Sequence, residues 1–143
     1  GTDKREVFKV ENATSANPII TELPYKNADG QSAMSAGYTI CVTSNPNDGN
    51  EIIRVISNYS SRSIAHSSDG GNIWNNISGN LEENSNGTGD GPSTRWASIL
   101  PFSDGTKLYL IGTSVGLFGA SQLDGLNTVW QQIGKNTIGN IFG

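Results

Sequence analysis

His66 has the side chain that most often performs catalysis or binds a metal, and in this chain it stands alone. It is the only histidine among the 143 residues, and the only cysteine, Cys41, lies in a different segment. A zinc site needs several His, Cys or carboxylate ligands, and nucleophilic catalysis needs a base beside the nucleophile. We therefore expect His66 to pack or to form a hydrogen bond at a strand end, with no catalytic or metal-binding role.

The polar loop Leu81–Ser93 is the strongest candidate for a binding loop, with Asn84, Asn86 and Asp90 as its candidate residues. Residues 86–91 place oxygen-bearing side chains at alternate positions, faintly as in a calcium loop. An EF-hand loop would also need a Glu eleven residues after its first ligand. That position is Ala97. The pattern predicts a long turn and no cofactor, with calcium as the alternative.

Composition excludes several classes of protein. The nine basic residues form no run and the net charge is −4, which argues against a nucleic-acid surface. Apolar runs such as Leu108–Leu110 have the length of strands, so no membrane span is expected. The 18 glycines favour many short strands and turns. Cys41 cannot form an internal disulfide and is expected to be a buried small hydrophobe.

The elements that would position these residues are arranged around one corner, residues 67–74 (Ser-Ser-Asp-Gly-Gly-Asn-Ile-Trp). Residues 62–66 before it and 74–78 after it alternate like strands, which predicts a β-hairpin with glycine at positive φ in its turn. The Asp69 carboxylate is expected to accept hydrogen bonds from backbone N–H groups two or three residues on. Trp74 is expected to fold back over the turn.

This corner resembles the Asp-box, or BNR repeat, of sialidases, sortilin-type receptors and many secreted bacterial β-propellers. The matching residues are Ser67, Asp69, Gly71 and Trp74. The resemblance implies an all-β fold with blades of four antiparallel strands, the box lying between the third and fourth strands as a structural fastener. Asp124, Gly125 and Trp130 are identified as a lengthened, divergent box.

The repeat spacing also indicates blades. About 54 residues separate Ile20, in a degraded box, from Trp74, and about 56 separate Trp74 from Trp130. Propeller blades typically have roughly 40–50 residues. We predict a partial β-propeller in which residues 1–24 end one blade, 32–80 and 93–134 form complete blades, and 137–143 begin another. The first strands of the complete blades are predicted at 35–43 and 95–100.

Two and a half blades cannot close a ring. We therefore expect the remaining blades of the same polypeptide, or a partner chain, to cover the open edges. The alternative is a complete small β-sandwich.

A second resemblance runs from about Val7 to Phe142. Segments 45–46, 57–59, 68–71, 74–81 and 111–118 are similar, in that order, to propeller regions of large secreted proteins from gliding and polymer-degrading bacteria. Proteins of that type are often exported by the type IX route. The resemblance implies an extracellular or cell-surface location, and it names no ligand.

The chain does not match the catalytic patterns of Asp-box glycosidases. Sialidases need an arginine cluster, whereas the four arginines are scattered and the Arg-Ile-Pro signature is missing. Enzymes of this type that act on β-glucans use two carboxylates facing each other across a cleft. The candidates, Glu82 or Glu83 with Asp90 or Asp48, all lie in polar loops where carboxylates are usually solvated. No catalytic residue is therefore predicted.

Trp96 follows Arg95 on a predicted inner strand, where its indole could stack on a sugar or a partner at the rim of the ring. We favour the other interpretation, a core residue between adjacent blades.

We predict a non-catalytic scaffold or binding module of a secreted or surface propeller, which presents loops such as 81–93 to a protein or glycan partner. One alternative is a fragment of a sialidase-like or β-glucanase-like Asp-box glycoside hydrolase whose catalytic residues lie mostly outside this segment. Another is an assembly subunit whose open blade edges are covered by another polypeptide.

Overall fold

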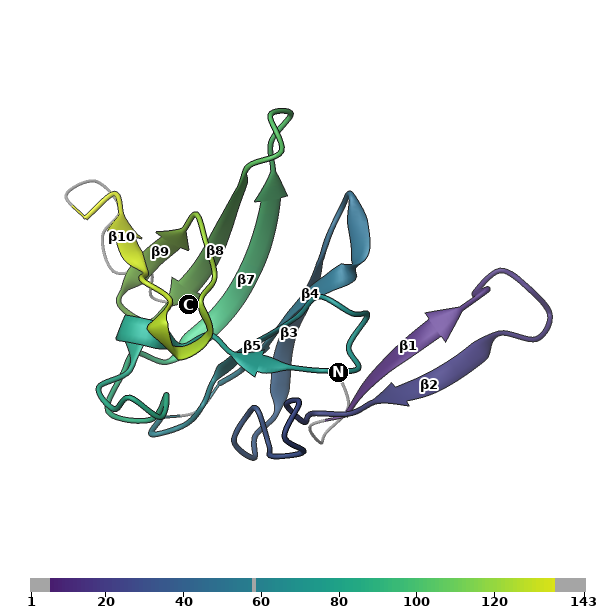
Figure 1. Cartoon of the computed structure of the whole chain (residues 1–143), viewed down its shortest axis with the longest axis horizontal. Coiled ribbons are helices and arrows are strands. Elements are labelled where there is room, and N and C mark those ends of the chain that lie inside the picture. Colours follow the sequence, from purple (N-terminus) through teal and green to yellow (C-terminus); the bar gives the residue numbers. More distant parts are fainter. Residues whose placement is uncertain (1–5, 58, 136–143) are drawn as a thin grey trace.

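The computed structural model describes residues 6–57 and 59–135, and its regular structure is antiparallel β-sheet with two short 3-10 turns. The predicted all-β class is therefore confirmed. One two-stranded and two four-stranded sheets are formed, and none of them closes on itself (Figure 1). The helical segments among the described residues have three residues each, so none has the length of a membrane-spanning helix.

The N-terminal hairpin consists of β1 (Val7–Glu11) and β2 (Ile19–Leu23), which pair Val7 with Leu23 and Val10 with Ile20. It projects away from the two larger sheets in Figure 1. Ile20, predicted to stand where Trp74 stands in the next repeat, is 64% exposed. Leu23, three residues later, is buried against the first large sheet.

The first large sheet is an up-and-down meander of β3 (Thr39–Asn45), β4 (Asp48–Ile56), β5 (Ile64–Ser67) and β6 (Asn75–Asn76). The sequence placed the first strand at 35–43, which is four residues too early. Ser35 instead exchanges hydrogen bonds with Arg62, whose N–H donates to Ser35 Oγ at 3.0 Å and whose carbonyl accepts from Ser35 N–H at 3.2 Å. These bonds hold the segment before β3 as a connection rather than a strand.

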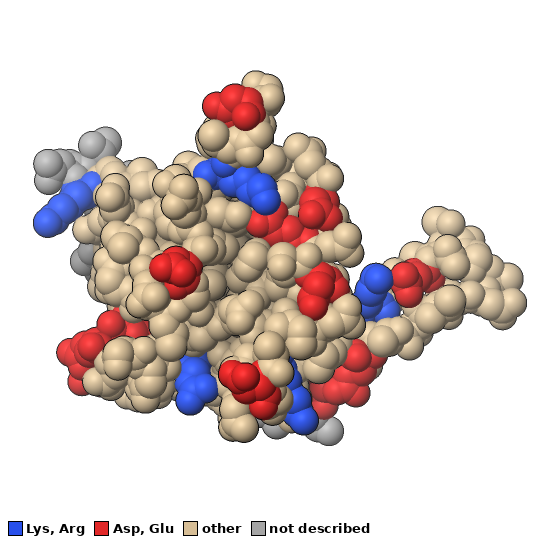
Figure 2. Space-filling model, in the orientation of Figure 1, with Lys and Arg blue, Asp and Glu red and all other residues tan. Residues whose placement is uncertain are grey.

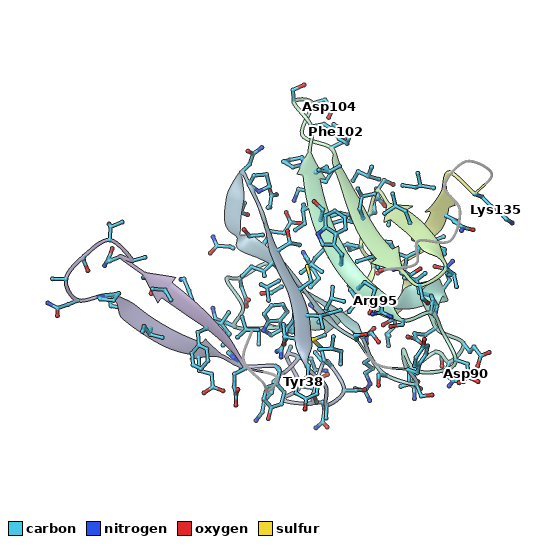
Figure 3. All side chains as sticks on the ribbon, turned by 180° about the vertical axis from the view of Figure 1, so that it is seen from behind. Tyr38, Asp90, Arg95, Phe102, Asp104 and Lys135 are labelled. Atoms are coloured by element: carbon cyan, nitrogen blue, oxygen red, sulfur yellow. The ribbon has the colours of Figure 1, made fainter. Side chains whose placement is uncertain are left out.

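The second large sheet repeats this order with β7 (Thr94–Pro101), β8 (Lys107–Thr113), β9 (Gly116–Ala120) and β10 (Gln131–Ile133). The strand predicted at 137–142 lies outside the described residues. In Figure 3, Arg95 marks the start of β7, and Phe102 and Asp104 mark the turn at its far end.

The two large sheets pack face to face, and their first strands β3 and β7 lie side by side. Ile53 and Val55 of the first sheet share one buried cluster with Ile99 and Ile111 of the second. Cys41 is only half-buried here, with its Sγ 3.8 Å from the Ala97 carbonyl oxygen. A second cluster covers the opposite face of the first sheet. Its buried members are Leu23, Ala33, Met34, Ile56, Ala65 and Trp74.

Asn80 and Trp130 connect the two sheets by direct hydrogen bonds. Trp130 N–H donates to Asn80 Oδ1 at 2.6 Å, and Asn80 Nδ2 donates to the Trp130 carbonyl at 3.0 Å. The Trp130 indole Nε1 donates to the Ile77 carbonyl at 2.8 Å. Gly79 has a φ of +52°, and an added Cβ would lie 1.8 Å from the Thr128 carbonyl oxygen. Only glycine permits this close approach of the two sheets.

Replacement of Asn80 by alanine should lower the free energy of unfolding by about 1–3 kcal/mol, because it leaves polar groups of the buried Trp130 backbone unpaired. Chemical denaturation measures the loss. The matched control is Asn47→Ala, since the exposed Asn47 side chain makes no hydrogen bond in the described structure. Equal stability of the two variants would show that the Asn80 bonds do not hold the sheets together.

Candidate functional site

Residues 67–74 form the corner between β5 and β6, the third and fourth strands of the first large sheet. Ser67 Oγ donates to Asp69 Oδ1 at 2.8 Å and accepts the Gly71 N–H at 2.9 Å. Asp69 Oδ1 also accepts from the backbone N–H groups of Asn72 and Ile73, at 3.0 and 2.9 Å. These donors lie three and four residues on, one further than expected. Desolvation opposes ionisation, but these hydrogen bonds outweigh it and hold the pKa of Asp69 below its usual value.

Trp74 fixes this corner to the hairpin that precedes the sheet. Its side chain is 1% exposed, and its indole Nε1 donates to the Gly71 carbonyl at 2.8 Å. Its backbone N–H donates to the Lys26 carbonyl at 3.0 Å. Gly71 has a φ of +91°, and an added Cβ would lie 2.5 Å from a methyl group of Leu23. The corner therefore joins two elements of the fold.

The divergent box between β9 and β10 is held differently. Asp124 N–H donates to Thr128 Oγ1 at 3.0 Å, and residues 125–127 form a 3-10 turn. The Trp130 indole bonds to Ile77 of the first sheet instead of its own turn. The Asp124 carboxylate is exposed and accepts no hydrogen bond from the described residues. Unlike Asp69, it is available to a ligand.

A cleft of about 630 Å³ lies beside this turn, between the two large sheets. We call it the amide cleft, because asparagines from four separate segments line it. Its polar lining includes Asn27, Arg62, His66, Asn76, Asn86 and Asp124. The divergent box and the loop 81–93, which the sequence singled out separately, thus contribute to one cavity. Its volume lies in the range of small-ligand sites.

Three of these asparagines are held with a fixed orientation. Asn27 Oδ1 accepts the N–H groups of Asp29 and Gln31, at 3.1 and 2.8 Å. Asn76 Oδ1 accepts the Ser78 N–H at 2.8 Å, and Asn86 Oδ1 accepts the Thr88 N–H at 3.1 Å. A backbone N–H can only donate, so each Oδ1 is committed to its own turn. Each Nδ2 remains a donor with no partner among the described residues, and that of Asn76 is buried.

Glu51 is the centre of a second polar group, deep between the sheets. Its side chain is 6% exposed. Its Oε1 accepts from Tyr109 Oη at 2.7 Å and lies 3.4 Å from His66 Nε2. Its Oε2 accepts from Lys107 Nζ at 2.8 Å and from Asn45 Nδ2 at 2.6 Å. The sequence around Glu51 indicates no role for it, because Lys107 and Tyr109 lie more than fifty residues away along the chain.

The pKa values of this group follow from burial and pairing. Burial opposes ionisation of Glu51, but the hydrogen bonds of Lys107, Asn45 and Tyr109 outweigh it and lower its pKa from 4.5 to about 2. Burial lowers the pKa of His66, although Glu51 acts in the opposite direction. His66 is therefore neutral at neutral pH, and its ring packs edge-on against Tyr109. The expected packing role at a strand end is what the structure shows.

The carboxylates proposed as a catalytic pair divide into two places. Glu82, Glu83 and Asp90 share the loop 81–93, where Glu82 Oε2 accepts the Gly91 N–H and Glu83 Oε2 accepts the Asp90 N–H, both at 3.3 Å. Burial raises the pKa of Glu82 to about 7, and repulsion from Glu83 and Asp90 adds to the shift. Asp48 lies apart from this loop, at the start of β4. The loop 81–93 leads to Thr94, whose Oγ1 donates to the Ile56 carbonyl at the other end of β4.

The candidate binding residues of the loop are also separated. Asn86 lines the amide cleft, while Asn84 Nδ2 donates to Thr88 Oγ1 within its own turn. Asp90 accepts a 3.5 Å bond from Ser60 Oγ, and Figure 3 shows it at the outer edge of the molecule. Trp96 is 48% exposed on the face of β7 that points away from the first sheet. The described residues include no cluster of His, Cys, Asp or Glu suited to a metal ion.

Replacement of Asp69 by alanine should cost about 1–3 kcal/mol of stability, because two backbone N–H groups and the Ser67 hydroxyl lose their acceptor. Thermal unfolding followed by circular dichroism measures the change. Ser68→Ala is the control, since Ser68 is exposed and its side chain makes no hydrogen bond in the described structure. If the Asp69 variant melts with the parent protein, the corner is not a fastener.

Glu51 should make stability depend on acid pH. Because its folded pKa is depressed to about 2 from 4.5, its contribution is present above about pH 4.5 and is lost as pH falls through 2. Glu51→Gln should lose about 2–4 kcal/mol at pH 7, since the Lys107 ammonium loses its carboxylate. It should also show a flatter stability profile between pH 4.5 and 2. Denaturant midpoints across this range test both effects, with the exposed Glu22→Gln as control.

Comparisons of this chain with protein-family models, with curated proteins and with solved structures find no match. A function for this chain is therefore inferred from its own residues and their contacts.

Proposed function

We propose that this chain is part of an Asp-box β-propeller of a secreted or cell-surface protein, and that it acts as a non-catalytic module that binds a protein or glycan partner. The observation that supports this best is the corner 67–74, which joins the third and fourth strands of a four-stranded meander. A second meander of the same order packs face to face on it. This is the arrangement that two neighbouring blades require.

The connection between successive elements also repeats. Ile20, Trp74 and Trp130 each precede an apolar residue by three positions, namely Leu23, Ile77 and Ile133. Three residues further on, the Lys26 carbonyl accepts the Trp74 N–H, and Asn80 Oδ1 accepts the Trp130 N–H. The backbone N–H of each of these two tryptophans thus binds the preceding element at the same sequence position. This regularity supports a repeating arrangement of blades.

Two apolar faces have no cover among the described residues. On the second sheet, Trp96 and Leu100 lie on the same face as Leu108 and Leu110, since directly paired residues share a face. On the hairpin, the exposed Phe8, Val10 and Ile20 share a face. We propose that further sheets of the same polypeptide cover both, because both faces of the first sheet are covered, one by the second sheet and the other by Leu23 of the hairpin.

A binding role is favoured over catalysis by the positions of the ionisable groups. Glu51 is bound by Lys107, Asn45 and Tyr109 between the sheets, and the neutral His66 packs beside it. Arg54 is buried and donates from Nε and Nη2 to Thr39 Oγ1. The charges on the visible face are scattered without a patch of one sign (Figure 2). Asparagines are the most frequent residues in the lining of the amide cleft, with Asp124 as its one carboxylate among the described residues. One observation favours the hydrolase alternative: Glu82, with a pKa of about 7, lies near Asp90.

If the partner is a glycan, the chain should bind at least one extracellular polysaccharide without cleaving it. Sedimentation with insoluble polysaccharides or a glycan array measures binding, and release of reducing ends measures cleavage. Retention without cleavage is expected. Cleavage that disappears in Glu82→Gln or Asp90→Asn would establish the hydrolase instead. Binding to none of the glycans would remove the glycan partner from the proposal.

A further inference from the structure

We propose that the amide cleft binds an acidic sugar residue, a uronate within a polysaccharide, through Arg62, its oriented asparagines and Asp124. This inference rests on the proposed function and adds to it the site and the class of sugar.

The cleft offers hydrogen-bond donors whose orientation is fixed. The Nδ2 groups of Asn27, Asn76 and Asn86 are donors whose orientation is fixed, because each Oδ1 is already bound to a backbone N–H of its own turn. The Nδ2 of Asn76 is buried and has no hydrogen-bond partner among the described residues, which is unfavourable for a polar group. A wall of fixed donors selects a ligand rich in oxygen acceptors, such as a carboxylate and ring hydroxyls.

Arg62 supplies the positive charge. It is half-buried, and its Nη1 donates to the Ser32 carbonyl at 2.8 Å, which restricts the long side chain. Its other guanidinium N–H groups have no partner among the described residues, so they are available to a carboxylate. Two other basic groups do not compete, because Lys107 is bound to Glu51 and burial keeps His66 neutral at neutral pH.

Asp124 provides a hydrogen-bond acceptor for the hydroxyl groups of a sugar, beside the donors of Arg62 and the asparagines. Its carboxylate is exposed in the cleft wall and accepts no hydrogen bond within the described structure. It would repel a ligand made of carboxylates alone, but it can accept a hydroxyl of a ligand that also carries hydroxyl groups. Leu123 and Leu126 offer apolar surface beside it for the C–H face of a ring. One cation, several donors and one acceptor together match a uronate better than a neutral sugar or an acidic peptide.

The test is a titration of the chain with trigalacturonate, followed by ¹⁵N–¹H NMR and by calorimetry. Shifts should cluster at residues of the amide cleft, and affinity should fall as salt is added. The methyl-esterified trisaccharide, which keeps the hydroxyls but loses the charge, should bind at least tenfold more weakly. Arg62→Gln should weaken trigalacturonate binding at least tenfold, and Asp124→Ala about threefold or more. The matched control, Arg95→Gln, removes an exposed arginine outside the cleft and should leave affinity unchanged.

Several results would overturn the inference. Equal binding of the ester would show that the charge is not recognised, and equal binding of oligoglutamate at the same residues would show that the sugar is not. Shifts outside the cleft would place the site elsewhere. No binding of trigalacturonate would also contradict the inference, while retention on another polysaccharide would leave the proposed function standing. If Arg62→Gln unfolds, as thermal melting would reveal, Asp124→Ala and the esterified ligand still decide the question.

Discussion

The alternation of side chains along two facing strands governs the interface on which the structure depends. Glu51, Ile53 and Val55 lie on one face of β4, because side chains of a strand repeat every second residue. Burial of Ile53 and Val55 against the second sheet therefore carries Glu51 into the same interface. On β8, Lys107 and Tyr109 lie on the same face as Ile111 by the same rule, and they provide the partners that the buried carboxylate needs. The alternation of side chains along β4 and β8 therefore determines both the apolar part of the interface and the polar group around Glu51.

The polar group around Glu51 also forms one wall of the amide cleft. His66 and Tyr109 belong to the Glu51 group and also line the amide cleft. Tyr109 Oη donates to Glu51 Oε1, and His66 Nε2 lies 3.4 Å from the same oxygen, so this wall of the cleft is fixed by the buried carboxylate. Its other wall is formed by turns whose asparagines are held by their own backbone. A rigid, polar lining reduces the ordering cost of binding, which is the condition under which a shallow cleft can retain a small ligand.

The sequence predicted the local features well. The eight strands of the two large sheets were all expected, and the hydrogen bonds of Asp69 and the burial of Trp74 follow from the order of residues 67–74. Long-range consequences were not predictable in this way. Nothing near Glu51 in the sequence points to Lys107 or Tyr109, and the exposure of Ile20 depends on what packs on its face. The Asx turns could have been found from Asn27-Ala28-Asp29 and Asn76-Ile77-Ser78, but their convergence on one cleft could not.

The corners before β6 and before β10 differ in what holds their aspartates. In the first, the Asp69 carboxylate is used up by the turn, and the Trp74 indole closes the same corner. In the second, the Trp130 indole bonds across to Ile77, and the longer turn is held by Thr128. The carboxylate of Asp124 is therefore no longer needed for the fold. The aspartate of the first corner is thus structural, whereas that of the second is free at the edge of a cleft. This difference is the physical reason why the proposed site lies at the second corner.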